Sequence, residues 1–366
     1  MSEVTNVSDL PVRTPRTCVR TAFRAFSVVA VLVAMASGVC AQVVIDRAAS
    51  ILIYPEIIAS DTRDTTIQIV NTSNAVVHAR CFYVNFAGTC VTSAAPCVTT
   101  NDCSDCVQSG AVTDFAVDLT LQQPAFWVAS QGRASGPGAL VPPVTIPFFG
   151  ELVCVEVNAD RAPISGDHLI GEATITDTSS GDVAKSHAAG IQGLAANNGD
   201  NVLCLGGGVT PECPTGAEYA ACPQSWLLDF VPDGTQDGIL GAGSAVHTNL
   251  AVVPCTLDLL NQNPGQTTVG FQVSNQFAQT FSSSRQSSAL FDTPITSIDT
   301  TNPTQSIFAR TTLGTDYARA VMASAQGNGF IATGQEFHTT GTSAPSEALS
   351  PYPQGAHAAG DRITLP

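Results

Sequence analysis

Two loops of the sequence concentrate oxygen-bearing side chains next to glycine, the composition that calcium-binding loops require. One is Asp233-Gly-Thr-Gln-Asp237-Gly238, and the other is Asn197-Asn-Gly-Asp200-Asn201. Ca²⁺ is bound by carboxylate and carbonyl oxygens, and glycine lets the backbone turn tightly around the ion. Neither loop has the ligand spacing of an EF-hand, and acidic turns also occur in exported β-proteins without metal. The sequence therefore offers Asp233, Asp237 and Asp200 as candidate Ca²⁺ ligands, with solvated turns as the alternative.

A second pattern joins an acid to an imidazole. Glu336 and His338 are two positions apart, so both lie on the same side of an extended strand. Such a pair can transfer protons or bind a metal, but a solvent-facing polar pair has the same spacing. The sequence contains no G-x-S-x-G, H-E-x-x-H or P-loop motif. We therefore predict no catalytic and no cofactor-binding residue, and favour a binding protein over an enzyme.

Cysteine usage is a further chemical signal. The chain has twelve cysteines, of which ten follow residues 1–41, a segment that we interpret below as an export leader. An even number of cysteines in an exported chain predicts a disulfide framework. Cys103 and Cys106 have the spacing of half a zinc site, but the second tight pair that zinc needs is missing. The cysteines that we expect in disulfides are Cys81, Cys90, Cys97, Cys103, Cys106, Cys154, Cys204, Cys213, Cys222 and Cys255.

The pairing of these cysteines is only partly predictable. Cys81 and Cys154 both fall on strand-like segments, and we prefer a bridge between them. The four cysteines of the loop 88–110 would then pair with one another, as would the four of the second half. The connectivity inside each group stays open, because spacing does not determine it.

Residues 1–41 have the features of a signal peptide. A long basic region is followed by an apolar run over residues 26–36, and small residues precede Gln42. We therefore predict export, to the extracellular space, the cell surface or the periplasm, with no membrane span in the mature chain. An uncleaved anchor and a lipidated Cys40 are the alternatives.

Composition excludes several classes of partner. The formal net charge is −16, and only 12% of the residues are charged. Such a chain cannot neutralise nucleic-acid phosphates, nor is it attracted to anionic membranes. Hydrophobic residues make up 44% of the sequence, which is too many for intrinsic disorder. We expect a folded, acidic protein whose partners are proteins or glycans.

The segment that reveals the fold class runs from Thr65 to Asn85. Ile67 and Ile69 alternate with polar residues, which is the pattern of a half-buried strand. A turn over residues 71–74 follows, and the return run is rich in β-branched and aromatic residues. Similar alternation recurs along the chain, so we predict an all-β fold and a hairpin at this segment.

Composition shifts divide the chain into segments. We predict a β-sandwich domain over 42–192 with a Cys-rich loop at 88–110, and a second β-sandwich domain over 224–338. A Cys- and Gly-rich linker or loop over 193–223 separates them, and a low-complexity tail covers 339–366. The order of strand and turn is similar in the two halves, so a duplication is an open possibility.

The strand TIQIVNTS, its polar turn and the cysteine-bearing strand that follows resemble the core hairpin of bacterial immunoglobulin-like domains. The pattern is also similar to exported proteins of uncharacterised function with that architecture. The resemblance implies two antiparallel immunoglobulin-like β-sandwich domains with disulfide-stapled loops. It implies no functional residue.

The function that these features favour is an exported, non-enzymatic binding protein or a structural protein of the cell envelope, which contacts protein or glycan through loops. One alternative is a secreted hydrolase whose carboxylates come together from separate strands. Another is a self-assembling surface subunit, which an unpaired edge strand would favour.

Overall fold

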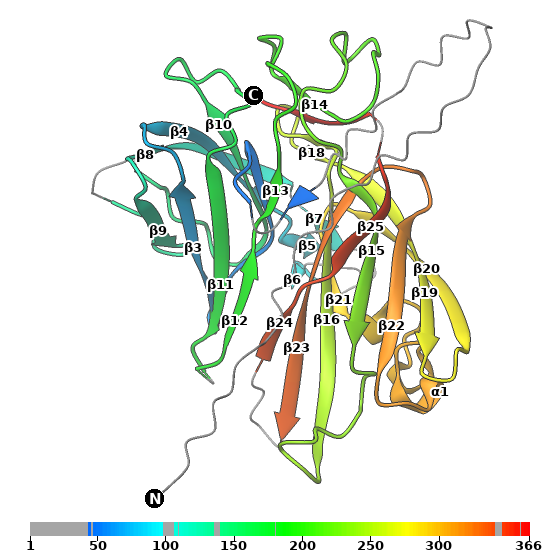
Figure 1. The fold of residues 1–366 in the computed structure, drawn as a ribbon. Helices are drawn as coiled ribbons and strands as arrows, with labels where there is room; N and C mark the ends of the chain where they lie inside the picture. Colours follow the sequence, from blue (N-terminus) through cyan, green and yellow to red (C-terminus); the bar gives the residue numbers. More distant parts are fainter. Residues whose placement is uncertain are drawn as a thin grey trace, which may run out of the picture. The chain divides into compact units, whose positions relative to one another are not determined.

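The computed structural model describes residues 43–44, 47–97, 106–108, 110–134, 140–179, 181–340, 346–358 and 360–366. Almost all of its regular structure is antiparallel β-sheet, and the strands of residues 41–366 belong to one unit (Figure 1). The all-β prediction is confirmed. The predicted signal peptide of residues 1–41 lies outside the described residues.

The first half of the chain folds into two packed layers. They are formed by one sheet of ten strands that folds back on itself between β2 and β3, which are joined by a single residue pair, Ala59 with Asp64. One layer contains β1 (Val43–Val44), β13 (Ala189–Ile191), β2 (Ile51–Ala59), β10 (Phe148–Val157), β4 (Val77–Asn85) and β8 (Ala111–Leu119). The other contains β12 (Val183–His187), β11 (Leu169–Asp177), β3 (Arg63–Asn71) and β9 (Pro124–Val128).

The predicted alternation fills the core between these layers. Ile67 and Ile69 of β3 are fully buried in one cluster with Leu52 of β2 and Tyr83 of β4. Burying apolar side chains between two layers is the main stabilising contribution in such a sandwich. The first half is therefore a β-sandwich.

The prediction of a hairpin over Thr65 to Asn85 is wrong. Segments β3 and β4 are both strands, but β3 pairs with β11 and β9, whereas β4 pairs with β10 and β8. The turn over residues 71–74 carries the chain from one layer to the other. The side chain of Asn71 fixes this crossing, because its Nδ2 donates to the carbonyl oxygens of Ala75, Leu119 and Thr120.

The second half also has two layers. One sheet contains β20 (Thr280–Ser288), β19 (Gln266–Asn275), β22 (Ala318–Ser324), β15 (Pro223–Phe230) and β25 (Tyr352–His357). The other contains β21 (Phe291–Pro294), β16 (Ser244–Pro254), β23 (Phe330–Thr340) and β24 (Ser346–Leu349). The turns η1 (Ile295–Ser297) and η2 (Pro303–Gln305) and the helix α1 (Arg310–Leu313) follow β21. Phe308, just before α1, packs its ring against Phe230 and Phe271.

Two small sheets complete the described structure. One contains β14 (Val202–Leu205), β26 (Asp361–Thr364), β17 (Leu257–Asp258) and β18 (Asn263–Pro264). The other contains β6 (Pro96–Cys97), β5 (Gly88–Cys90) and β7 (Cys106–Gln108). Thus the predicted tail supplies strands β24, β25 and β26, and Ile363 of β26 is fully buried. The predicted linker likewise supplies β14.

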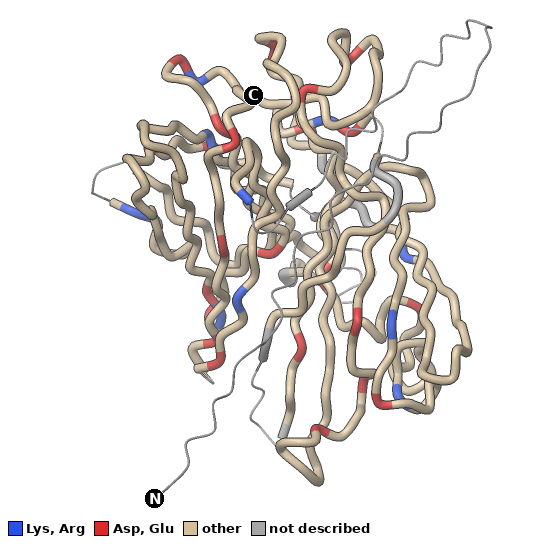
Figure 2. Tube along the Cα trace, viewed as in Figure 1, with Lys and Arg blue, Asp and Glu red and all other residues tan. Residues whose placement is uncertain are grey.

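One hydrophobic cluster joins the two halves. It contains Ile53 and Val153 of the β2–β10 layer together with Ala251 and Ile331 of the β16–β23 layer. Few of the residues along these strands are charged (Figure 2). The contact between the halves is therefore mainly apolar, and two separate immunoglobulin-like domains remain a prediction.

Candidate functional site

The loop between β15 and β16 carries two imidazole–carboxylate pairs. Asp233 accepts a hydrogen bond from Nδ1 of His247 on β16, with Oδ2 2.8 Å away. Asp237 accepts from Nδ1 of His338 on β23 at 2.5 Å. The loop is thus bound to two neighbouring strands through the side chains that the sequence offered as Ca²⁺ ligands.

The predicted pair of Glu336 and His338 lies beside this loop. Nε2 of His338 is 3.2 Å from Oε1 of Glu336, so the imidazole lies between two carboxyl groups. Sequence reasoning found the acid two positions away but not Asp237, which is distant in the chain. The two carboxyl groups and the imidazole form a buried polar cluster at the end of the sheet, because Asp237 and Glu336 are both almost inaccessible.

The electrostatics of the loop follow from these contacts. Hydrogen bonds from the backbone N–H groups of Leu240 and Ile239, and from His338, hold the pKa of Asp237 below its ordinary value. The hydrogen bond to Asp233 raises the pKa of His247. The Asp237–His338 pair therefore favours the ionised carboxylate of Asp237, and the Asp233–His247 pair favours the protonated imidazole of His247.

An open pocket of about 140 Å³ lies against this loop. Its walls are formed by Asp233, Gly234, Pro303, Thr304, Ala309, Arg310 and Thr311. The backbone N–H of Arg310 donates to the carbonyl oxygen of Asp233 at 2.9 Å, and the N–H of Asp233 donates to that of Phe308 at 3.0 Å. These bonds hold the segment before α1 against the loop and define the pocket.

The pocket offers several kinds of polar contact. Asp233 supplies a carboxylate acceptor. Arg310, whose Nε is 2.5 Å from Oδ1 of Asp316, supplies a half-exposed guanidinium donor. Thr304 and Thr311 add hydroxyl groups, and Pro303 and Ala309 add apolar surface. A pocket that combines few polar groups with apolar walls is suited to a small polar ligand.

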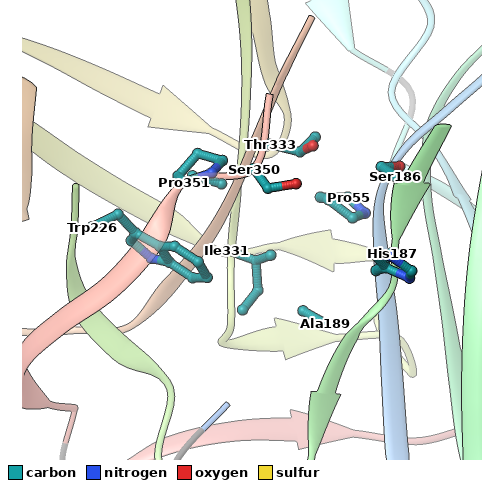
Figure 3. A pocket seen from close by; sticks show the side chains of 10 residues that line it. Pro55, Ser186, His187, Ala189, Trp226, Ile331, Thr333, Ser350 and Pro351 are labelled. Carbon is teal, nitrogen blue, oxygen red and sulfur yellow. The ribbon is translucent and has the colours of Figure 1, made fainter. Parts of the chain in front are cut away.

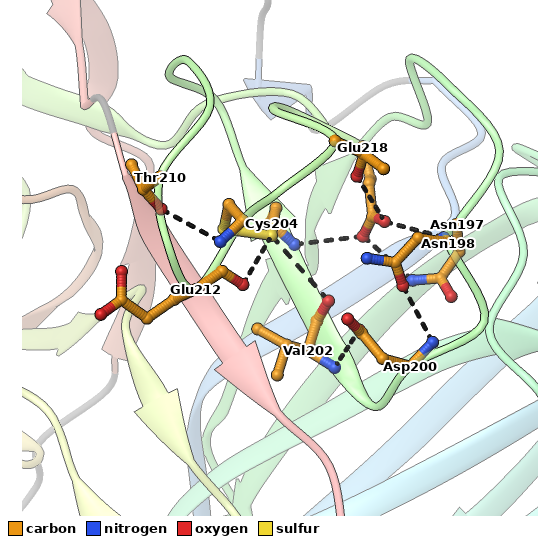
Figure 4. The surroundings of a disulfide bond; sticks show 10 residues. Asn197, Asn198, Asp200, Val202, Cys204, Thr210, Glu212 and Glu218 are labelled. Carbon is orange, nitrogen blue, oxygen red and sulfur yellow. Dashed lines mark hydrogen bonds between the residues drawn. A yellow bond between two sulfur atoms is a disulfide. The ribbon is translucent and has the colours of Figure 1, made fainter.

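The second candidate calcium loop is closed by its own hydrogen bonds (Figure 4). Oδ1 of Asp200 accepts from the N–H of Val202 at 2.8 Å, and Oδ1 of Asn197 accepts from that of Gly199 at 2.9 Å. The buried carboxylate of Glu218 accepts from Nδ2 of Asn197 at 3.0 Å and from the N–H of Asn198 at 2.9 Å. The side-chain oxygens therefore stabilise turns instead of converging on one point.

The structure does not bring Asp200 together with Asp233 and Asp237. Within the described ranges, no group of three or more His, Cys, Asp and Glu side chains has the arrangement of a metal site. Calcium binding by either loop therefore stays a prediction.

A further imidazole–carboxylate pair lies outside both loops: His78 is on β4, with Nδ1 2.7 Å from Oδ1 of Asp118.

The disulfides follow the predicted grouping where they are described. Cys81 is bonded to Cys154, Cys204 to Cys213, and Cys222 to Cys255. Cys90 and Cys97 are also disulfide-bonded. Cys106 lies opposite Cys90 in the pairing of β5 with β7, whereas Cys103 falls outside the described residues.

Antibody-type domains join their two sheets by a disulfide. Here Cys81 and Cys154 are on β4 and β10, neighbouring strands of one layer. The resemblance to immunoglobulin-like domains therefore does not extend to the disulfide.

A second pocket lies where the two halves meet (Figure 3). Pro55, His187 and Ala189 come from the first half, and Trp226, Ile331 and Thr333 come from the second. Its volume is about 20 Å³, which is enough for about one water molecule. It is too small to be a ligand site.

Two functional candidates were missed by sequence reasoning. Glu56, which follows the pocket-lining Pro55, and Glu151 are both buried, each inside a run of apolar residues. A carboxylate among apolar neighbours in a strand is the signal that could have identified them, since ionisable side chains are rarely buried without a partner.

No protein-family model matches this chain, and no curated protein sequence matches it either. Within the part of the chain that the structure describes, no helix has the length and hydrophobicity needed to cross a bilayer.

Proposed function

We propose that this chain is an exported binding protein of the cell exterior or envelope. Its disulfide bonds support this proposal, because they persist in oxidising compartments. The all-β scaffold supports it as well. Packed sheets hold their loops rigidly, and loops of this kind are where binding sites usually lie.

The observation that carries the proposal is the pocket beside Asp233. A carboxylate, a guanidinium group and two threonine hydroxyls surround it, next to the apolar faces of Pro303 and Ala309. A saccharide unit matches this lining, because it presents hydroxyl groups around its ring and C–H groups on its faces. We therefore propose glycan binding at this pocket, with a protein loop of similar polarity as the other possible partner.

A glycan array with the purified protein tests this proposal. The variants Asp233→Asn and Thr311→Val remove a charge and a hydroxyl from the pocket wall, and each should lower affinity at least tenfold. Asp258→Asn is the matched control, because Asp258 lies outside the pocket and its carboxylate accepts hydrogen bonds from the neighbouring Asn261. Unchanged binding in both pocket variants would place the glycan elsewhere.

A secreted hydrolase is the second candidate, and one observation favours it. Asp233 orients the imidazole of His247 and raises its pKa, as an acid does for a general base. Incubation of the array ligands with the protein separates the two functions. A binding protein leaves the glycans intact, whereas a hydrolase releases shorter products, and His247→Gln stops their release.

A further inference from the structure

Two carboxyl groups lie among apolar residues of neighbouring strands, whereas a third, that of Glu156 on β10, is bound to Nδ1 of His168 at 2.7 Å. Glu56 of β2 is 4% exposed, and Glu151 of β10 is fully buried. Tyr54 pairs with Leu152 and Ile57 with Gly150, which leaves Pro55 and Glu56 opposite Glu151 alone. This is a β-bulge, in which two residues of one strand face a single residue of its neighbour. The bulge brings the two glutamates to the same place in the layer.

Both glutamates face the second half of the protein. Along β10, Leu152 belongs to the core of the first sandwich, while Val153 belongs to the cluster shared by the two halves. Strand alternation places Glu151 on the same face as Val153. Pro55, next to Glu56, lines the pocket with Ile331 and Thr333 of β23 (Figure 3).

The charged neighbours of Glu56 come from two other strands. Arg63 of β3 has Nη2 3.9 Å from Oε1 of Glu56, and the same nitrogen donates to Oε1 of Gln335 at 2.7 Å. Asp292 of β21 acts on Glu56 as a second negative charge. Its Cα partner is Ala251, so it lies on the face of the β16–β23 layer that meets the first half.

Glu151 has no such charged neighbour among the residues that the structure describes. Neither of its carboxyl oxygens makes a hydrogen bond to another described residue. Its Cα partner on β4 is Val84, which is apolar. The facing strands β16 and β23 contribute Asn249, Ala251, Thr333 and Gln335, which are uncharged. His247 lies on that face further along β16, bound to Asp233.

An ionised carboxylate is expensive in these surroundings. Burial raises the pKa of Glu151 to about 8. Burial and the repulsion from Asp292 raise the pKa of Glu56 to about 8 as well, although Arg63 opposes them. The neutral acid is far cheaper to bury than the anion. Both side chains therefore carry a proton at neutral pH.

We propose that Glu56 and Glu151 form a proton-dependent joint between the β2–β10 layer and the β16–β23 layer. The layers pack closely while both carboxyl groups are protonated, and the joint loosens when base removes the protons. Because each pKa is raised in the folded state, the stabilisation is complete below the unfolded value of 4.5 and is lost as pH rises through about 8. The inference does not depend on the proposed function.

Hydrogen exchange with mass spectrometry tests the joint in the intact wild-type protein. Above pH 8, peptides of β10 and β23 should exchange at least tenfold faster than expected from the intrinsic increase of the amide exchange rate with pH. Peptides of β19, in the outer sheet of the second half, should follow the chemical rate. Equal acceleration of β19 would indicate global unfolding and would overturn the proposal.

Thermal melts of the variants Glu56→Gln and Glu151→Gln provide the second test, because glutamine imitates the neutral acid. The melting temperature of the wild type should fall between pH 5 and pH 9. The double variant should lose most of that fall, and the control Glu212→Gln, an exposed glutamate, should keep it. If the double variant fails to fold, the exchange experiment still decides the question. A wild-type pH dependence in a folded double variant would contradict the joint.

Discussion

The indole Nε1 of Trp127 on β9 donates a hydrogen bond to the phenolic oxygen of Tyr83 on β4, at 2.5 Å. The two strands belong to opposite layers of the first sandwich, and both side chains are buried. Phe115 packs against both rings, with centroids 5.0 Å from Tyr83 and 6.0 Å from Trp127. This bond therefore joins the two layers inside the core.

The variant Tyr83→Phe tests the importance of that bond. It removes the acceptor and leaves the indole N–H buried without a partner, which costs about 1–3 kcal/mol of unfolding free energy. Denaturant unfolding followed by tryptophan fluorescence measures the loss. Tyr352→Phe is the matched control, because Tyr352 is 59% exposed and its hydroxyl group can be replaced by water. An equal effect of both variants would argue against the interlayer bond.

The three disulfides for which both partners are identified should differ in their contribution to stability. Their sequence separations are 73 residues for Cys81–Cys154, 33 for Cys222–Cys255 and 9 for Cys204–Cys213. A longer loop constrains the unfolded chain more, so the entropic contributions are about 4 kcal/mol for the longest loop and about 3 kcal/mol for the shortest. Paired Cys→Ala variants, unfolded by denaturant, should therefore lose stability in this order. A reversed order would show that contacts in the folded state, and not the entropy of the unfolded chain, determine the loss of stability.

A substitution of Gly171 should disturb the first core. A Cβ atom on this glycine of β11 would lie 1.9 Å from the hydroxyl oxygen of Tyr54 on β2. Tyr54 is buried and donates to the carbonyl oxygen of Gln68, so it cannot move without losing that bond. We expect Gly171→Ala to cost about 1–3 kcal/mol. Gly208→Ala should have little effect, because a Cβ there meets no atom within 4 Å, and thermal melts compare the two variants.

Calcium would have to compete with existing hydrogen bonds in both candidate loops. The carboxylates of Asp233 and Asp237 already accept hydrogen bonds from His247 and His338. Asp200 caps its own turn by accepting from the N–H of Val202. A cation would have to displace these donors before it could bind. Thermal melts with millimolar calcium and with a chelator test the calcium prediction: a higher melting temperature with calcium would confirm it, and an unchanged melting temperature would contradict it.

The effect of Asp237 on the pH dependence of stability follows from its lowered pKa. Asp237 has a lowered pKa, so its contribution to stability is present above the unfolded value of 3.8 and is lost as pH falls through the folded value. Asp237→Asn should therefore lower the melting temperature at pH 7 and remove part of the acid sensitivity. The exposed Asp316→Asn is the control, and melts between pH 2 and pH 7 provide the comparison.

Local patterns were sufficient to predict the strands, but not their partners. The alternation around Ile67 and Ile69 reports which face of β3 is buried, because side chains of a strand point to opposite faces in turn. It contains no information on whether β3 pairs with β4. That choice depends on contacts such as those of Asn71 with Leu119, which come from residues distant in the sequence.

The candidate site shows the same limit. Glu336 and His338 are close in sequence, and their proximity could be predicted from strand geometry. The bond between Asp237 and His338 spans 101 positions and forms only after β23 has paired with β16. Glu56 and Glu151 were missed because their apolar neighbours dominate the pattern, although those neighbours are what make the two carboxyl groups unusual.

The pairing of β26 affects the order in which the parts of the chain can fold. Its residues Asp361–Thr364 lie between β14 and β17, which are made much earlier. The strands of the first sandwich are all synthesised by residue 191, so this part can fold before the rest of the polypeptide has been made. The small sheet must wait for the last strand, and until then β14 and β17 are exposed to proteases and chaperones. A nascent chain stalled before residue 361 should thus have a protected first sandwich and a cleavable segment around β14.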